Sequence, residues 1–120
     1  MPTYFILDTT TIQGRYLLFT DNTTTVLIGQ NKTQHHRTIL QQTLELLRQH
    51  TIPRFQEPTL TATLQGAGLY QINHEQKTIE FFGHSLAFFY VPLGPLQEIT
   101  QDLKEKTGLD LIINEKRHTF

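Results

Sequence analysis

The chain has 120 residues, of which 38% are hydrophobic and none is cysteine, and its formal net charge is -1. This length suits one domain with one core, and the lack of cysteine excludes disulfides, thiol nucleophiles and thiolate metal sites. The near-neutral charge gives no general attraction to nucleic acid, and no apolar run is long enough to span a membrane. We therefore expect a single cytoplasmic domain over residues 1–120, without a signal peptide and with a monomer as the favoured state.

Three short apolar runs in the first quarter of the chain predict β-strands separated by polar turns. They cover residues 4–8, 15–19 and 24–29. Apolar residues follow one another in these runs instead of alternating with polar ones. We therefore expect the strands to be buried on both faces.

The apolar period then changes from that of a strand to that of a helix. One helical stripe contains Ile39, Leu40, Thr43, Leu44, Leu46 and Leu47. This stripe predicts a helix that begins between Thr33 and His36 and ends near His50, with Thr33 placed to be its N-cap. Pro53 prevents the helix from continuing.

The middle of the chain predicts three further strands. Residues 59–65 alternate polar and apolar side chains, and Gly66-Ala67-Gly68 is expected to break or bulge this strand. Residues 69–73 and 78–82 are expected to pair as a hairpin through a four-residue loop, 74–77.

The last third predicts a helix and one strand. Gly94-Pro95 opens the helix, Leu96, Ile99 and Leu103 form its buried stripe, and Gly108 ends it. A strand follows at residues 109–114, and the polar tail 115–120 is expected to fray. The fold class is therefore α+β, with a single mixed β-sheet of about six or seven strands and two α-helices.

Local motifs give one candidate for chemistry. The six histidines show no metal-ligand spacing on the predicted helix, so we expect no metal site and no cofactor. His36 stands at the helix entry, where the positive end of the dipole favours neutral imidazole and free N–H groups attract anions. The aromatic residues are not accompanied by a basic stripe, so nucleic acid is not an expected partner. Ser85 is the only serine beside nineteen threonines, and its surroundings, Gly83 to Ala87, lack the last glycine of a nucleophile elbow.

Several segments together have the order and spacing of one known family. Gly66-Ala67-Gly68-Leu69 is followed by an eleven-residue hairpin, 70–80, and then by Phe81-Phe82-Gly83-His84-Ser85-Leu86-Ala87-Phe88. Upstream, Gly29 precedes His36 by seven residues, and an earlier segment reads Gly14-Arg15-Tyr16-Leu17-Leu18. This combination resembles the protein histidine phosphatase family, also called Janus/Ocnus, over nearly the whole chain.

The resemblance implies a phosphohistidine phosphatase-like fold and a metal-independent phosphatase. Its substrate would be phosphohistidine in a protein, or a small phosphoramidate. His36 would be catalytic, as general base for water or as phosphoryl acceptor. The groups that bind phosphate would be the Arg15 guanidinium, the backbone N–H groups of Arg37 and Thr38, the Ser85 hydroxyl and the backbone N–H of Ala87.

Two departures from the family pattern leave a second function open. Leu69 stands where the family has an arginine, so one guanidinium that would bind phosphate is missing. Residues 89–93 add an apolar segment where the family turns quickly into Gly-Pro. The alternative is therefore a non-catalytic phosphate-binding or protein-interaction domain on the same fold.

Overall fold

One mixed sheet of six strands forms the centre of the computed structural model, which describes residues 3–20, 24–49, 64–83 and 93–120. Its strands are β1 (Thr3–Leu7), β2 (Gln13–Thr20), β3 (Thr25–Asn31), β4 (Leu64–Asn73), β5 (Thr78–Phe82) and β6 (Asp110–Asn114). The described helices are α1 (His36–Gln49), α3 (Leu93–Glu98) and α4 (Thr100–Thr107). The predicted α+β class with a single mixed sheet is confirmed.

The strands lie in the order β1-β3-β2-β4-β5-β6. The four central strands, from β3 to β5, pair antiparallel, while β1 and β6 are added in parallel at the two edges. The hairpin of β4 and β5 has the predicted boundary, because Asn73 pairs with Thr78 across the loop 74–77. The Asn73 side chain accepts the N–H groups of Glu75 and Gln76, which folds this loop.

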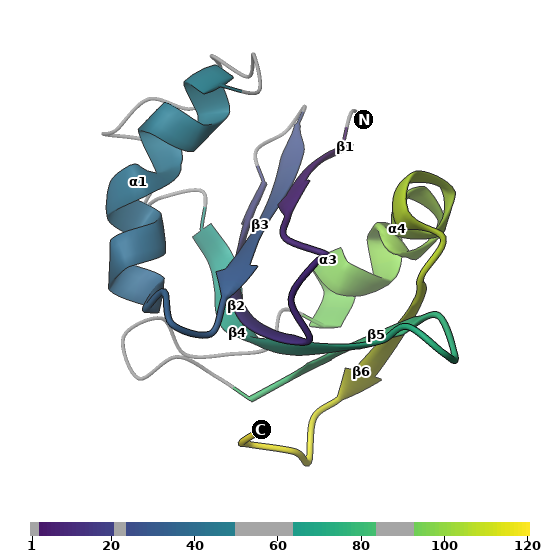
Figure 1. Ribbon diagram of the computed structural model, residues 1–120. Coiled ribbons are helices and arrows are strands. Elements are labelled where there is room, and N and C mark those ends of the chain that lie inside the picture. The colour runs from purple at the N-terminus through teal and green to yellow at the C-terminus, as the bar shows by residue number, and fades with distance from the viewer. Residues whose placement is uncertain (1–2, 21–23, 50–63, 84–92) are drawn as a thin grey trace.

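Helices cover both faces of the sheet, so the molecule has three layers (Figure 1). Leu17 and Leu18 are adjacent in β2 and fully buried, yet they belong to two different core clusters. The cluster around Leu17 includes Ile39 of α1, and the cluster around Leu18 includes Leu96 of α3 and Leu103 of α4. The prediction of burial on both faces is therefore confirmed for β2 and β3, but it is wrong for β1, where Tyr4 is 40% exposed.

The glycine-rich segment was expected to break or bulge a strand, and the structure shows a bulge beside it and no break. Gly66, Ala67 and Gly68 lie within β4 and pair with β2, and the only irregularity between these two strands is one extra residue, Gln65. Glycine is needed here for close packing, because a Cβ on Gly68 would lie 2.7 Å from the Phe82 carbonyl oxygen. The part of the predicted strand before residue 64 lies outside the described residues.

The C-terminal helix is divided into two. α3 ends at Glu98 and α4 begins at Thr100, and both use the predicted stripe, which is buried. Gly108 has φ 74° and donates its N–H to the Lys104 carbonyl oxygen at 2.8 Å, which confirms it as the residue that ends the helix.

The C-terminal tail was expected to fray, and this prediction is also wrong. The Arg117 guanidinium pairs with Glu80, donates to the Gln71 side chain at 2.5 Å and lies 4.0 Å from the centre of the Phe82 ring. The Arg117 carbonyl oxygen accepts the Gly83 N–H at 2.8 Å, and the Phe120 ring meets Phe82 edge-on. Residues distant in sequence therefore fix a tail that looks unstructured locally.

Replacing Arg117 with alanine should lower the free energy of unfolding by about 1.5–3 kcal/mol, the usual effect of losing hydrogen bonds to a charged group. The loss should be large for a tail residue because it leaves the half-buried Glu80 carboxylate without its cation. Urea denaturation measures it, with the exposed neighbour Lys116→Ala as control. Equal midpoints for the two variants would contradict the prediction.

Two buried tyrosines offer a matched test of hydrogen bonding in the core. Tyr70 donates its hydroxyl to the Asp8 carbonyl oxygen at 2.9 Å, whereas the buried Tyr16 hydroxyl has no partner among the described residues. Tyr70→Phe should lower the free energy of unfolding by about 1 kcal/mol, while Tyr16→Phe should leave it unchanged or raise it. Thermal and urea denaturation of both variants would measure the change in the free energy of unfolding. A larger decrease for Tyr16→Phe than for Tyr70→Phe would show that the Tyr16 hydroxyl makes a hydrogen bond in solution.

Candidate active site at the start of the first helix

The chain turns sharply between β3 and α1, and this turn presents the first residues of the helix. Asn31 accepts the Thr33 N–H with its side chain and the Gln34 N–H with its backbone carbonyl. The first helical hydrogen bond joins the Ile39 N–H to the His35 carbonyl oxygen at 3.0 Å. Thr33 is therefore part of the turn, and its prediction as the N-cap is wrong.

His36 is the first residue of α1, and its side chain turns inward to the sheet. It is 9% exposed, and its Nε2 lies 2.7 Å from the Gly68 carbonyl oxygen. A carbonyl oxygen only accepts hydrogen bonds, so Nε2 must carry the hydrogen. In neutral His36 the lone pair that takes up a proton or attacks an electrophile is therefore on Nδ1.

The environment of His36 favours this neutral form. Burial lowers the pKa of the imidazole below its ordinary value of 6.5, and the positive charges of Arg15 and His35 lower it further. The hydrogen bond to Gly68 acts in the opposite direction and only partly offsets these effects. A neutral imidazole at neutral pH is the form that a general base or a nucleophile requires.

This lowered pKa predicts how stability depends on pH. Below about pH 6.5 the unfolded chain protonates at this histidine more readily than the folded protein does. The contribution of neutral His36 to stability should therefore be present above that pH and lost as the pH falls toward the lower folded value. Urea denaturation over this range, with His36→Gln as the control without a titrating group, measures the effect. An equal dependence on pH in both proteins would refute it.

Arg15 lies beside His36 and supplies the positive charge predicted for the site. It is half-buried in β2 and donates a long hydrogen bond, 3.4 Å, to the Gln34 carbonyl oxygen just before the helix. Its register partner in β4 is Leu69, the residue that follows Gly68. Both groups therefore lie near the start of α1. β2 carries the guanidinium of Arg15, and the Gly68 carbonyl oxygen of β4 holds the imidazole of His36.

The first turn of α1 adds hydrogen-bond donors to this arrangement. The N–H groups of His36, Arg37 and Thr38 precede the first helical hydrogen bond, and within the described ranges no acceptor meets them. Arg37 is exposed and Thr38 is half-buried. Such N–H groups, beside a guanidinium and at the positive end of a helix dipole, form a favourable environment for an anion.

The structure thus brings together four of the six predicted site residues, His36, Arg15, Arg37 and Thr38. Ser85 and Ala87 lie outside the described residues, as do residues 89–92 of the predicted apolar segment 89–93. Two groups that the sequence did not assign to the site are the carbonyl oxygens of Gly68 and Gln34. A glycine inside a strand is the one sequence signal of such close backbone approach.

In the part of the chain that the structure describes, no three histidine, aspartate or glutamate side chains gather where they would hold a metal ion. None of the described helices is long and apolar enough to cross a membrane. Neither the protein-family models nor the curated proteins include one that matches this sequence.

Proposed function

We propose that this protein is a metal-independent phosphatase that hydrolyses phosphohistidine or a related phosphoramidate at the start of α1. The observation that carries the proposal is the His36 imidazole, held through Nε2 by the Gly68 carbonyl oxygen beside Arg15. The resemblance to the Janus/Ocnus family supports the same assignment of His36.

Arg15 and the N–H groups of Arg37 and Thr38 would bind the phosphoryl oxygens and stabilise the negative charge of the transition state. They add no bond to phosphorus, so their role is positioning and charge stabilisation. Ser85 and the Ala87 N–H are proposed to complete this set of donors, on the resemblance alone.

Two routes are open for the chemical step. As a general base, Nδ1 takes a proton from water while the water oxygen bonds to phosphorus. As a phosphoryl acceptor, Nδ1 itself bonds to phosphorus, and water later releases phosphate from it. In both routes the P–N bond breaks, its electron pair stays on the leaving nitrogen, and that nitrogen takes up a proton.

The test is release of inorganic phosphate from a phosphohistidine peptide with EDTA present. We expect turnover by the wild-type protein, and no turnover above the spontaneous rate would overturn the phosphatase proposal. Mass spectrometry of quenched reactions separates the two routes, because only the acceptor route leaves a transient phosphoryl group on the protein.

The alternative is a phosphate-binding domain without turnover, and Leu69 favours it. This apolar side chain lies opposite Arg15 in the sheet, where the family resemblance would place a second guanidinium. Titration with inorganic phosphate, followed by NMR, distinguishes the two functions. Shifts of the Arg37 and Thr38 amides without hydrolysis would support the alternative, and no shifts at millimolar phosphate would exclude the phosphate-binding alternative.

A further inference from the structure

The outer edge of β1 carries no paired strand in the part of the chain that the structure describes. There, β1 ends the strand order and pairs only with β3. The Asp8 N–H, just after β1, donates to the Gly29 carbonyl oxygen of β3 at 2.8 Å. Backbone groups of a strand alternate between its two sides, so those of Phe5 and Leu7 point away from β3. No hydrogen bond among the described residues reaches these outward N–H and C=O groups.

β1 also lacks the features that usually protect an edge. Its five residues, Thr-Tyr-Phe-Ile-Leu, include no charge and no proline, and its pairing with β3 contains no bulge. The opposite edge differs, because β6 begins with Asp110, which forms an ion pair with Lys104. The two edges of the same sheet are therefore unequal in their protection against an added strand.

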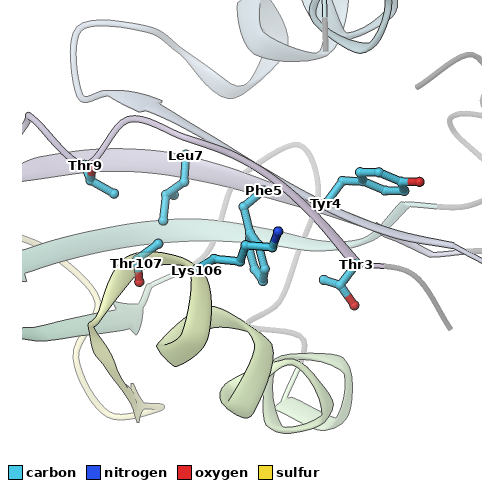
Figure 2. A pocket seen from close by; sticks show the side chains of 7 residues that line it. All are labelled: Thr3, Tyr4, Phe5, Leu7, Thr9, Lys106 and Thr107. Carbon is cyan, nitrogen blue, oxygen red and sulfur yellow. The ribbon is translucent and has the colours of Figure 1, made fainter. Parts of the chain in front are cut away.

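A groove of about 480 Å³ runs beside this edge, between β1 and the end of α4. Figure 2 shows Phe5 and Leu7 pointing toward α4, with Lys106 and Thr107 facing them. The groove therefore has an apolar side from the strand and a cation at its rim. Lys106 makes no ion pair with any described residue, whereas Lys104, two residues earlier in α4, pairs with Asp110.

We propose that β1 and this groove bind an extended peptide segment of a partner protein, which adds a strand to the sheet. Its main chain would pair with the outward groups of Phe5 and Leu7, and alternate side chains would enter the groove. The partner segment would carry a small apolar residue against Phe5 and Leu7 and a carboxylate for Lys106.

A second copy of this chain fits the groove less well. Antiparallel pairing of two β1 strands centred on Phe5 would place Thr3, Phe5 and Leu7 of the second copy on the groove side. None of these residues carries a carboxylate, so the Lys106 charge would stay unpaired. The charge at the rim therefore favours an acidic partner segment over self-association.

NMR titration with two acetylated and amidated peptides tests the proposal, Thr-Val-Thr-Glu-Thr-Val-Thr and the same sequence with lysine in place of glutamate. We expect the Phe5 and Leu7 amides to shift, and the glutamate peptide to bind about fivefold more tightly than the lysine peptide. The exchange Lys106→Glu should reverse this preference, while Lys116→Glu, on the exposed tail, should preserve it.

No shift of the β1 amides at millimolar peptide, or equal affinity for the two peptides, would overturn the proposal. Sedimentation of the protein alone tests the other occupant. A dimer whose formation protects the Phe5 amide from hydrogen exchange would overturn the proposal in favour of a second copy. These measurements do not depend on phosphatase activity, so the peptide-binding proposal and the phosphatase proposal are tested independently.

Discussion

Replacing His36 with alanine is expected to lower kcat for phosphohistidine hydrolysis by about 10²- to 10⁴-fold, the usual contribution of a positioned acid–base group. The reason is that the substitution removes Nδ1, whether it acts on water or on phosphorus. The Michaelis constant should change little, because the oxygens are bound by Arg15 and the N–H groups of the first helical turn. Steady-state kinetics with EDTA present would separate kcat from KM.

His35→Ala is the matched control for this variant. His35 is the preceding residue and also a histidine, but its side chain is exposed, and among the described residues it makes no side-chain hydrogen bond. The control should therefore retain wild-type kcat to within a few-fold. If His36→Ala and His35→Ala were equally active, His36 would not be the catalytic group. If both lost all activity, the defect would lie in the start of the helix and not in one imidazole.

The sequence predicted best those parts of the fold that depend on neighbours along the chain. The hairpin of 69–73 and 78–82 was predicted with its correct four-residue loop because the two apolar runs lie next to each other in the sequence. The helix end at Gly108 was predicted for a similar reason, since a left-handed C-terminal residue is a local requirement. The predicted start of α1, between Thr33 and His36, includes the observed one because the change of period occurs within a few residues.

The contacts that the sequence did not predict involve partners that are distant in sequence. Arg117 reaches Glu80 and Gln71 across 37 and 46 residues, and nothing local to the tail indicates them. Gly68 likewise looks like a strand breaker until the β2 and β5 neighbours that crowd it are known. In the site, the predicted helix start indicated His36 as a candidate. Only the folded sheet brings the Gly68 carbonyl oxygen to Nε2, and this contact leaves the Nδ1 lone pair available for chemistry.

Gly68→Ala is expected to lower the free energy of unfolding by about 1–3 kcal/mol, the usual cost of overpacking a core. The added Cβ would lie 2.7 Å from the Phe82 carbonyl oxygen and 3.0 Å from the Tyr16 ring. Backbone and a buried ring cannot rotate away, so β4 must shift. That shift moves the carbonyl oxygen that holds His36, and kcat should fall together with stability. Urea denaturation measures the first effect, and the ¹⁵N shifts of His36 report whether Nε2 still carries the hydrogen.

Substitutions at two other glycines serve as controls. They separate the loss of stability caused by a crowded Cβ from the effect on the orientation of His36. The Cβ added by Gly94→Ala in α3 meets no atom of the described residues within 4 Å, so stability should stay unchanged or rise by up to about 1 kcal/mol. Gly14→Ala brings its Cβ within 2.4 Å of both the Gln30 carbonyl oxygen and the Tyr70 ring, so it should destabilise at least as much as Gly68→Ala. It does not touch the Gly68–His36 hydrogen bond, so the ¹⁵N shifts of His36 should stay at their wild-type values. If Gly68→Ala also left those shifts unchanged, the Gly68 carbonyl oxygen would not be what orients the imidazole.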